Sequence, residues 1–231
     1  MRKALFWDFD GTLSHSKGSA QIIDGILKKR GFEIPLDEIK QYVHAILPWW
    51  IPEKSYTEHT GEPWWDWISG QFEPLYEKYK LQERDRANVA SDFKKSALNP
   101  ANYVLYDDAL STLSRCVELG YENYVLSNNF PGFASVVSAL GLSEYLRGCV
   151  ISADIGYEKP RIEIFDYALA LAGRPRECWM IGDSPAADIA GGRAAGMKTI
   201  LVHSERESEA DYACASLGEV PAAVVPPKTK I

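Results

Sequence analysis

The feature that most constrains the fold is a regular alternation of short apolar runs and amphipathic stretches in the second half of the chain. Each apolar run is bounded by turn residues and followed by apolar residues at helical spacing, which is typical of buried strands joined by helices. The runs are residues 124–126, 149–151, 178–181 and 199–202, and residues 4–7 form a similar run near the N-terminus. This pattern predicts an α/β fold, a Rossmann-like doubly wound parallel sheet with helices on both faces.

Residues 16–100 show a different pattern, in which apolar side chains recur every three or four positions. Ile39, Tyr42, Val43 and Ile46 are one example of this helical spacing. A third helical run contains Gly70 and Pro74 and is expected to bend or split there. We therefore predict that residues 16–100 form an all-helical cap domain, and that residues 1–15 and 101–231 form a Rossmann-like catalytic core.

Composition and charge argue against several classes of protein. The formal net charge of −7 speaks against a broad nucleic-acid surface, and no apolar run approaches the length of a membrane span. No apolar leader follows Arg2 and Lys3, and the four cysteines contain no Cys-x-x-Cys pair. We expect reduced thiols in a cytoplasmic protein that binds neither nucleic acid nor membrane, and either a monomer or a homodimer.

The most informative short motif is Asp8-Phe9-Asp10-Gly11, which directly follows the first apolar run. Residues two apart on a strand point to the same face, so both carboxylates would meet at the carboxyl end of a strand, where open α/β sheets bind ligands. Two such charges repel each other unless a cation lies between them, and a divalent cation is the obvious candidate. The alternative interpretation is an ordinary Asp-Gly turn or helix cap.

Three further motifs follow later strands, and each alone has an ordinary explanation. Ser127-Asn128 is commonly a turn or cap, Lys159 before a proline is commonly a solvated lysine, Gly182-Asp183 a turn, and Asp188 a surface charge. Their occurrence in order, each near the end of a predicted strand, favours a shared site.

Taken together, these motifs resemble those of the haloacid dehalogenase superfamily over residues 3 to about 220. The resemblance implies a mobile four-helix cap inserted after the first strand. It further implies a Mg²⁺-dependent phosphohydrolase that acts on a small phosphorylated metabolite through an aspartyl-phosphate intermediate. One departure from the family pattern is Arg161, where an acidic residue is common.

The same resemblance implies a role for each site residue. Asp8 would be the nucleophile and Asp10 the general acid and base. The phosphate would be bound by Ser127, Asn128 and Lys159. Mg²⁺ would be bound by the carboxylates of Asp8 and Asp183 and the backbone carbonyl of Asp10, with Asp188 supporting them from further out.

Several alternatives stay open at this point. A phosphomutase would share all of these residues, a haloacid dehalogenase would have no use for the acid Asp10, and a regulatory binding protein would not need the intact set. A second open question concerns the tryptophans at positions 49, 50, 64, 65 and 67. They either pack the core of the helical cap, or one or two of them line the substrate pocket.

Overall fold

The computed structural model describes residues 2–204 and 209–225, so Met1, residues 205–208 and the last six residues of the predicted core lie outside the described residues. The described residues form a six-stranded sheet in the order β5-β4-β1-β6-β7-β8, in which every pairing is parallel. The strands of this sheet are β1 Lys3–Trp7, β4 Glu122–Ser127, β5 Leu146–Ile151, β6 Glu177–Gly182, β7 Lys198–Val202 and β8 Tyr212–Cys214. A separate two-stranded antiparallel sheet consists of β2 Ser14–Ser16 and β3 Tyr103–Leu105. The predicted α/β class with a Rossmann-like parallel sheet is confirmed.

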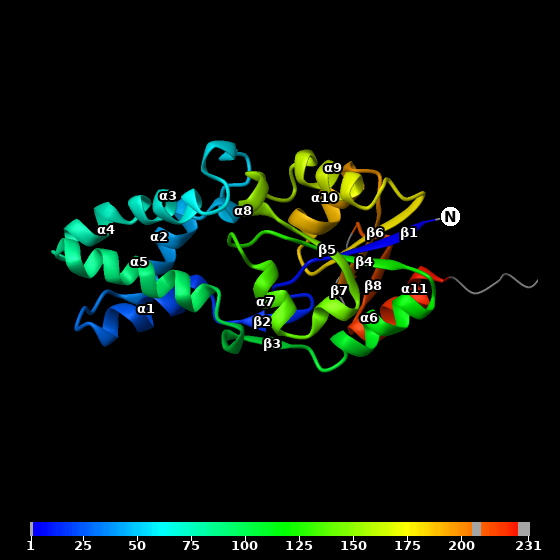
Figure 1. Ribbon diagram of the computed structural model, residues 1–231, viewed down its shortest axis with the longest axis horizontal. Helices are drawn as coiled ribbons and strands as arrows, with labels where there is room; N and C mark the ends of the chain where they lie inside the picture. Colours follow the sequence, from blue (N-terminus) through cyan, green and yellow to red (C-terminus); the bar gives the residue numbers. More distant parts are fainter. Residues whose placement is uncertain (1, 205–208, 226–231) are drawn as a thin grey trace, which may run out of the picture.

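Helices cover both faces of the sheet, with α9 and α10 on one side and α6 and α11 on the other (Figure 1). The helices of this part are α6 Ala109–Glu118, α7 Ala134–Ala139, α8 Ser152–Ile155, α9 Ile162–Leu171, α10 Gly191–Ala194 and α11 Val220–Val224. Alternate residues of β1 enter different cores: Leu5 packs in one with Leu113 of α6, and Phe6 packs in the other with Phe165 of α9. The sheet is therefore buried on both faces, which explains its continuous apolar strands.

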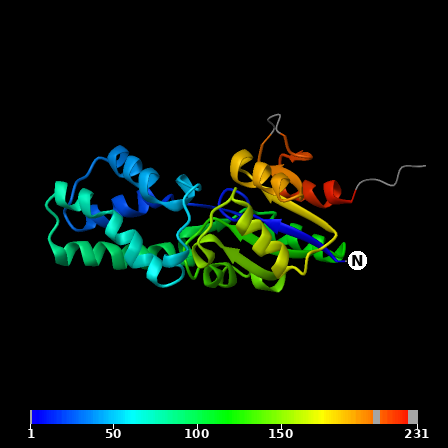
Figure 2. The same ribbon diagram turned by 90° about the horizontal axis from the view of Figure 1, so that it is seen from above.

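The path of the chain through the sheet brings three strand ends together. β1 lies between β4 and β6, and the chain adds strands outward from β1 on both sides. The carboxyl ends of these three strands are thus neighbours at the point where the strand order reverses, the usual ligand site of such sheets. Figures 1 and 2 show β1 running from the N-terminus toward a group of helices at the opposite end of the molecule.

That group of helices comes from the predicted helical region. Residues 17–102, all of which the structure describes, contain helices and turns but no strand. The helices are α1 Ser19–Lys29, α2 Leu36–Ile46, α3 Pro63–Gln71, α4 Glu73–Lys78 and α5 Glu83–Ala97. We call residues 19–97 the helical segment. The expected break in the third helical run is confirmed, because α3 ends at Gln71 and α4 begins at Glu73 with Pro74 in its first turn.

The sequence did not predict the small sheet at the base of the helical segment. β2 and β3 pair antiparallel where the chain leaves the core and where it returns, with Ser14 opposite Leu105 and Ser16 opposite Tyr103. Each strand has only three residues, and Ser14-His15-Ser16 shows no alternation of apolar and polar side chains. The two strands begin 89 positions apart, at Ser14 and Tyr103, so no local sequence pattern predicts that they pair. The residues after Leu13 indicate only a change from strand to helix.

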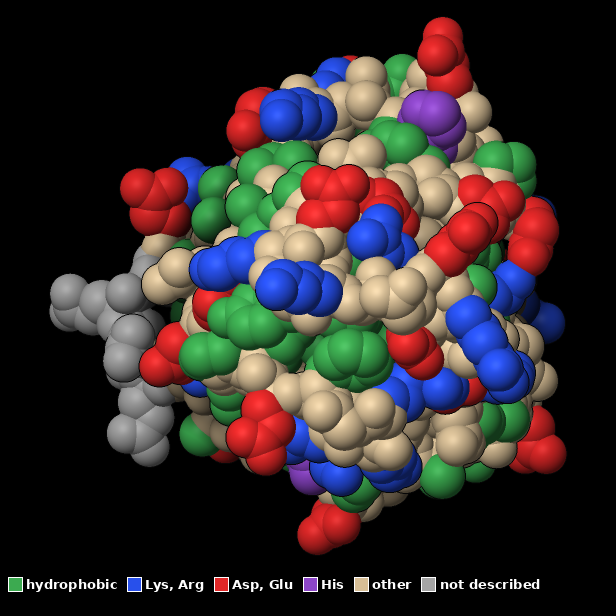
Figure 3. Space-filling model, turned by 90° about the vertical axis from the view of Figure 1, so that its left-hand side faces the viewer, with side chains coloured by type: hydrophobic (Ala, Val, Ile, Leu, Met, Phe, Trp, Pro, Cys, Tyr) green, Lys and Arg blue, Asp and Glu red, His purple; other side chains and the backbone are tan. Residues whose placement is uncertain are grey.

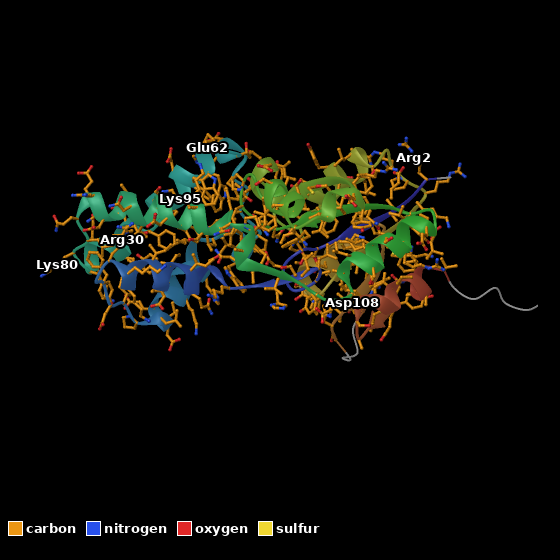
Figure 4. The ribbon with its side chains drawn as sticks, turned by 60° about the horizontal axis from the view of Figure 1, so that its bottom comes forward. Arg2, Arg30, Glu62, Lys80, Lys95 and Asp108 are labelled. Atoms are coloured by element: carbon orange, nitrogen blue, oxygen red, sulfur yellow. The ribbon has the colours of Figure 1, made fainter. Side chains whose placement is uncertain are left out.

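Charged side chains cross-link the helices of the helical segment at its surface. Arg30, directly after α1, pairs with Asp92 of α5, and Lys94 of α5 pairs with Glu62, just before α3; Figure 4 labels Arg30 and Glu62. On the face drawn in Figure 3, acidic and basic side chains are interspersed rather than gathered by sign. Among the described helices, none has the length and apolar character that crossing a bilayer requires.

Candidate active site

The carboxyl ends of the strands open onto a cavity of about 540 Å³ between the sheet and the helical segment. The segments that follow β1, β4 and β6 form its floor, and residues 16–22 and 40–50 contribute to the opposite wall. The structure brings together all the residues that the sequence singled out as catalytic, phosphate-binding or metal-binding. Asp8, Asp10, Ser127, Asn128, Lys159, Asp183 and Asp188 all line this cavity.

Lys159 is a buried cation at the centre of the floor, and its side chain is only 2% exposed. Its ammonium group donates hydrogen bonds to Asp8 Oδ1 at 2.7 Å, to Asp188 Oδ1 at 2.6 Å and to the carbonyl oxygen of Leu126 at 2.9 Å. Burial alone would lower the pKa of Lys159, but the charges of Asp188 and Asp8 outweigh burial and raise this pKa. Lys159 therefore stays protonated and fixes a positive charge beside Asp8.

Asn128 fixes the backbone that carries Lys159. Its Oδ1 accepts a hydrogen bond from the Lys159 N–H at 2.7 Å, and its Nδ2 donates to the Lys159 carbonyl at 3.0 Å. Both ends of the Asn128 amide are thus used in positioning Lys159, and the predicted phosphate contact of Asn128 stays a prediction. The guanidinium group of Arg161 donates hydrogen bonds to the Glu163 carboxylate and to the backbone carbonyl of Glu53. Arg161 therefore does not compete with Lys159 for the carboxylates of Asp8 and Asp188.

Asp10 has surroundings very different from those of Asp8. Its two carboxylate oxygens accept hydrogen bonds from neutral groups, Ser16 Oγ at 2.7 Å and Asn129 Nδ2 at 2.8 Å. Burial raises the pKa of Asp10 to about 6 and the charge of Asp8 adds to the increase, while the bonds from Ser16 and Asn129 oppose it. Asp10 can therefore exchange a proton near neutral pH.

A tight turn after β1 carries the chain past Asp183. Gly11 has a φ of +88°, and its N–H donates to the Ser14 carbonyl at 2.7 Å. A Cβ atom at this position would lie 2.3 Å from Asp183 Oδ2, so only glycine fits. The side chain of Thr12 then reaches Asp183 Oδ1 at 3.4 Å. The turn thereby sets the spacing between the acidic residues that follow β1 and β6.

Three carboxylates form a cluster suited to a divalent cation. Asp8, Asp183 and Asp188 each offer an oxygen atom, and these atoms lie within 4.8 Å of one another. When all three are ionised, they carry two more negative charges than the single ammonium group of Lys159 offsets. The pKa of Asp183 is raised, first by its partial burial and then by the charge of Asp8. Oxygen donors with uncompensated negative charge fit Mg²⁺, which prefers such ligands.

Ser127 ends β4 with its hydroxyl group at the cavity floor. The hydroxyl is buried, and it has no hydrogen-bond partner among the described residues. Buried polar atoms are nearly always hydrogen-bonded, so an unpaired one in a cavity indicates a group meant for a ligand. A phosphoryl oxygen would satisfy it.

The structure separates the five clustered tryptophans into two sets. Trp49 and Trp50 line the cavity, in agreement with one of the two interpretations. Trp64 and Trp65 are buried in the core, and Trp67 stacks on Tyr56 and His59 outside the cavity lining. The packing interpretation therefore holds for three of the five residues, and Trp49 and Trp50 are available to a ligand.

Sequence reasoning missed the two residues that hold Asp10. Asn129 directly follows the Ser127-Asn128 motif, so its position next to a strand end was the only available signal. Ser16 ends β2, whose pairing with β3 sets its position, and no local pattern indicates that it would face Asp10.

Comparison with known proteins gives independent evidence on the family of the chain. A family model described as haloacid dehalogenase-like hydrolase matches residues 2–196. The glyceraldehyde 3-phosphate phosphatase of Methanothermobacter thermautotrophicus is 30% identical over 218 residues, which are 92% of this chain and 91% of that protein. The phosphoserine phosphatase of Thermus thermophilus is 31% identical over 133 residues, 56% of this chain and 51% of that protein.

Solved structures resemble the whole chain. The HAD-hydrolase YfnB from Bacillus subtilis superposes with a TM-score of 0.74 at 21% identity, covering 96% of this chain and 98% of that one. The 2-haloacid dehalogenase from Pseudomonas syringae gives a TM-score of 0.72 at 20% identity, covering 97% and 98%. At these identities the likeness establishes the fold, including a helical segment, and leaves the reaction to be argued from the site.

Proposed function

The chain belongs to the haloacid dehalogenase-like hydrolases, and from this premise we propose that it is a Mg²⁺-dependent phosphatase of small phosphorylated metabolites. The observation that carries the proposal is the contrast between Asp8 and Asp10. Asp8 lies beside a buried ammonium group, whereas Asp10 is held by neutral donors and has a pKa raised to about 6. A nucleophile must be ionised and a general acid must carry a proton, so the two environments suit two roles.

The named relatives support a phosphate ester as the substrate class. The protein from Methanothermobacter thermautotrophicus is a glyceraldehyde 3-phosphate phosphatase and matches over 92% of this chain. The protein from Thermus thermophilus is a phosphoserine phosphatase. Both names describe small phosphorylated molecules, and the ester that this chain cleaves is a separate question.

In the proposed mechanism, Asp8 attacks the phosphorus atom and Asp10 gives its proton to the departing alcohol oxygen. The ester P–O bond breaks as an aspartyl-phosphate forms on Asp8. Asp10, now ionised, takes a proton from a water molecule as the water oxygen attacks the phosphorus. The bond between Asp8 and the phosphorus breaks, which releases inorganic phosphate and regenerates Asp8. Lys159 and the Ser127 hydroxyl hold the phosphoryl oxygens during both steps.

Asp8 and Asp183, with the backbone carbonyl of Asp10, would hold Mg²⁺, and Asp188 would support them through its contacts with Lys159 and with the Ser184 N–H at 3.0 Å. When bound, the ion would offset the repulsion between the phosphate and the carboxylates.

We also propose that residues 16–100 act as a cap on a catalytic core made of residues 1–15 and 101–231. The contributions of Lys17, Lys40, Trp49 and Trp50 to the wall opposite Asp8 support this division. All four cysteines are free thiols, which suits the reducing cytoplasm where we place the protein.

The proposal is tested by measuring phosphate release from a panel of phosphorylated sugars, nucleotides and short acids. We expect release that requires Mg²⁺, stops with excess chelator, and is abolished in Asp8→Asn but retained in Asp66→Asn, which changes an exposed aspartate of α3. Full activity in excess chelator would refute the metal assignment.

The same panel separates the rival reactions. A phosphomutase would convert its substrate without releasing phosphate, and a regulatory binding protein would bind an ester without turnover. Halide release from 2-haloacids without phosphate release from any ester would identify a dehalogenase, which needs no acid at position 10.

A further inference from the structure

The wall of the cavity opposite the carboxylates contains an unusual aromatic surface. Trp49 and Trp50 lie on the turn Pro48–Trp50, directly after α2, and both line the same cavity as Asp8. The turn is held by hydrogen bonds from the Trp50 N–H to the Leu47 carbonyl at 3.0 Å and from the Ile51 N–H to the Pro48 carbonyl at 2.9 Å. The two indoles are therefore carried on an ordered piece of backbone.

Packing fixes the indole of Trp49 from behind. Its ring stacks parallel to Trp64, with ring centroids 6.4 Å apart, and meets the edge of Phe130 at 5.1 Å. Trp64 and Phe130 are themselves buried. Trp49 is thus a pre-positioned flat surface that loses little freedom when a ligand binds.

Trp50 is different, because much of its indole is uncovered. Its ring contacts the His44 ring of α2 at a centroid distance of 4.1 Å and a tilt of 33°, yet the residue is 52% exposed. Trp50 and Trp49 together form an aromatic surface in the lining of the cavity that contains Asp8, where a ligand can contact both rings. Since the reacting phosphate must lie at Asp8, the part of the substrate that reaches Trp50 is the alcohol that leaves.

The cavity also has room for more than a short ester. Its volume of about 540 Å³ lies within the range of cavities that enclose drug-sized ligands. Aromatic walls bind flat rings by stacking. Ala20, Ile22 and Val43 add further apolar surface to the cavity lining.

We infer that the substrate is a phosphate monoester whose alcohol carries a planar ring, which stacks on Trp50 and Trp49. This inference rests on the proposed phosphatase function and specifies its substrate class. Nucleotides and aryl-alkyl phosphates share this chemistry, and the experiment distinguishes between them.

The test compares esters that differ in flatness but hardly in leaving group. Benzyl phosphate is paired with cyclohexylmethyl phosphate, and nucleoside 5′-monophosphates are paired with ribose 5-phosphate, all with the full chain and Mg²⁺. We expect kcat/KM to favour the flat member of at least one pair by about tenfold or more, the size of a single good stacking contact. Preference in the first pair alone indicates an aryl alcohol, and preference in the second alone indicates a nucleoside.

Variants of Trp50 test whether this residue causes the preference for the flat ester. Trp50→Leu should reduce the preference to near unity while hydrolysis of the ester without an aromatic ring continues, and Trp50→Phe should keep most of the preference. Tyr167→Leu is the matched control, since Tyr167 on α9 is equally open, at 51%, and lies outside the cavity lining; it should leave the preference unchanged.

The two possible failures are distinguishable. Equal turnover of esters with and without an aromatic ring, or a preference that persists in Trp50→Leu, would overturn the inference and leave the phosphatase function standing. If no ester of either kind releases phosphate, the proposed function itself is wrong and the inference falls with it.

Discussion

Two carboxylates separated by one residue can perform opposite tasks because their neighbours differ. Asp8 accepts a hydrogen bond at 2.7 Å from the ammonium group of Lys159, a buried positive charge. Asp10 receives only the neutral donors Ser16 and Asn129 and has its pKa raised to about 6. The chemistry of the site thus depends on which partners the fold brings to each residue, more than on the identity of the two aspartates.

At this scale we predict that Asp10→Asn keeps Mg²⁺ and substrate binding but lowers kcat by about 10²–10⁴-fold, the usual contribution of a general acid or base. An alkyl phosphate should lose more than p-nitrophenyl phosphate, whose leaving group needs no proton. Steady-state rates with both esters check this prediction. An equal loss for the two esters would mean that Asp10 does not protonate the leaving group.

At the scale of elements, a loop of the helical segment is anchored beside Lys159. The Tyr56 N–H donates to the Gly156 carbonyl at 3.0 Å, and the Tyr56 hydroxyl donates to the fully buried Glu158, the residue that precedes Lys159. Gly156 has a φ of +85°, and a Cβ there would lie 2.6 Å from the backbone of Thr57. This close contact joins the helical segment to the part of the chain that carries Lys159, at a place away from the two chain crossings.

We predict that Glu158→Gln changes how stability depends on pH. Burial raises the pKa of Glu158 from 4.5 to about 7, although Tyr56 and Lys159 oppose the increase. A raised carboxyl pKa favours folding at low pH, and this contribution is lost as pH rises from about 4.5 through 7. The unfolding free energy of the wild type should therefore fall relative to Glu158→Gln by up to about 3 kcal/mol, since one pKa unit corresponds to about 1.4 kcal/mol.

Denaturant unfolding of both proteins between pH 4.5 and 8 measures this difference directly, because the other titrating groups are common to both. Glu58→Gln, an exposed change on the same loop, should follow the wild type. Parallel curves for the wild type and Glu158→Gln would show that Glu158 does not titrate in this range.

For the whole molecule, the cavity that Asp8 lines lies between the sheet and the helical segment, while the N-terminus lies at the far end of the sheet (Figure 1). The protein carries a net charge of −7, and part of this excess is concentrated in the cluster Asp8, Asp183 and Asp188. Mutual repulsion within that cluster opposes folding, so a bound divalent cation should stabilise the entire fold.

We predict that Mg²⁺ at about 100 times its dissociation constant adds about 2.7 kcal/mol to the unfolding free energy. For a chain of this size that corresponds to a rise in Tm of roughly 5–10 °C. Thermal unfolding with and without Mg²⁺ measures the shift, which Asp183→Asn should largely remove and Asp66→Asn should retain. A shift of the same size in Asp183→Asn would place the stabilising ion elsewhere.

The sequence alone determined the parallel sheet, the helical region and the floor of the cavity. Each of these depends on local patterns: apolar runs, helical spacing, and short motifs such as Asp8-x-Asp10 at strand ends. Because parallel strands bring their carboxyl ends to one edge, residues as distant in the chain as Asp8 and Asp183 can be assigned to one cavity from these patterns.

Only the tertiary structure decided the partners of Asp10, the anchoring of Tyr56 on Glu158, and which tryptophans reach the cavity. An amphipathic pattern indicates that one face of a helix is buried, but not what that face packs against. Ser16 reaches Asp10 through the pairing of β2 with β3. Trp64 and Phe130 pack against Trp49, whereas Trp50 contacts the His44 ring and stays 52% exposed. These contacts join residues far apart in the chain, and the packing of the whole molecule sets them.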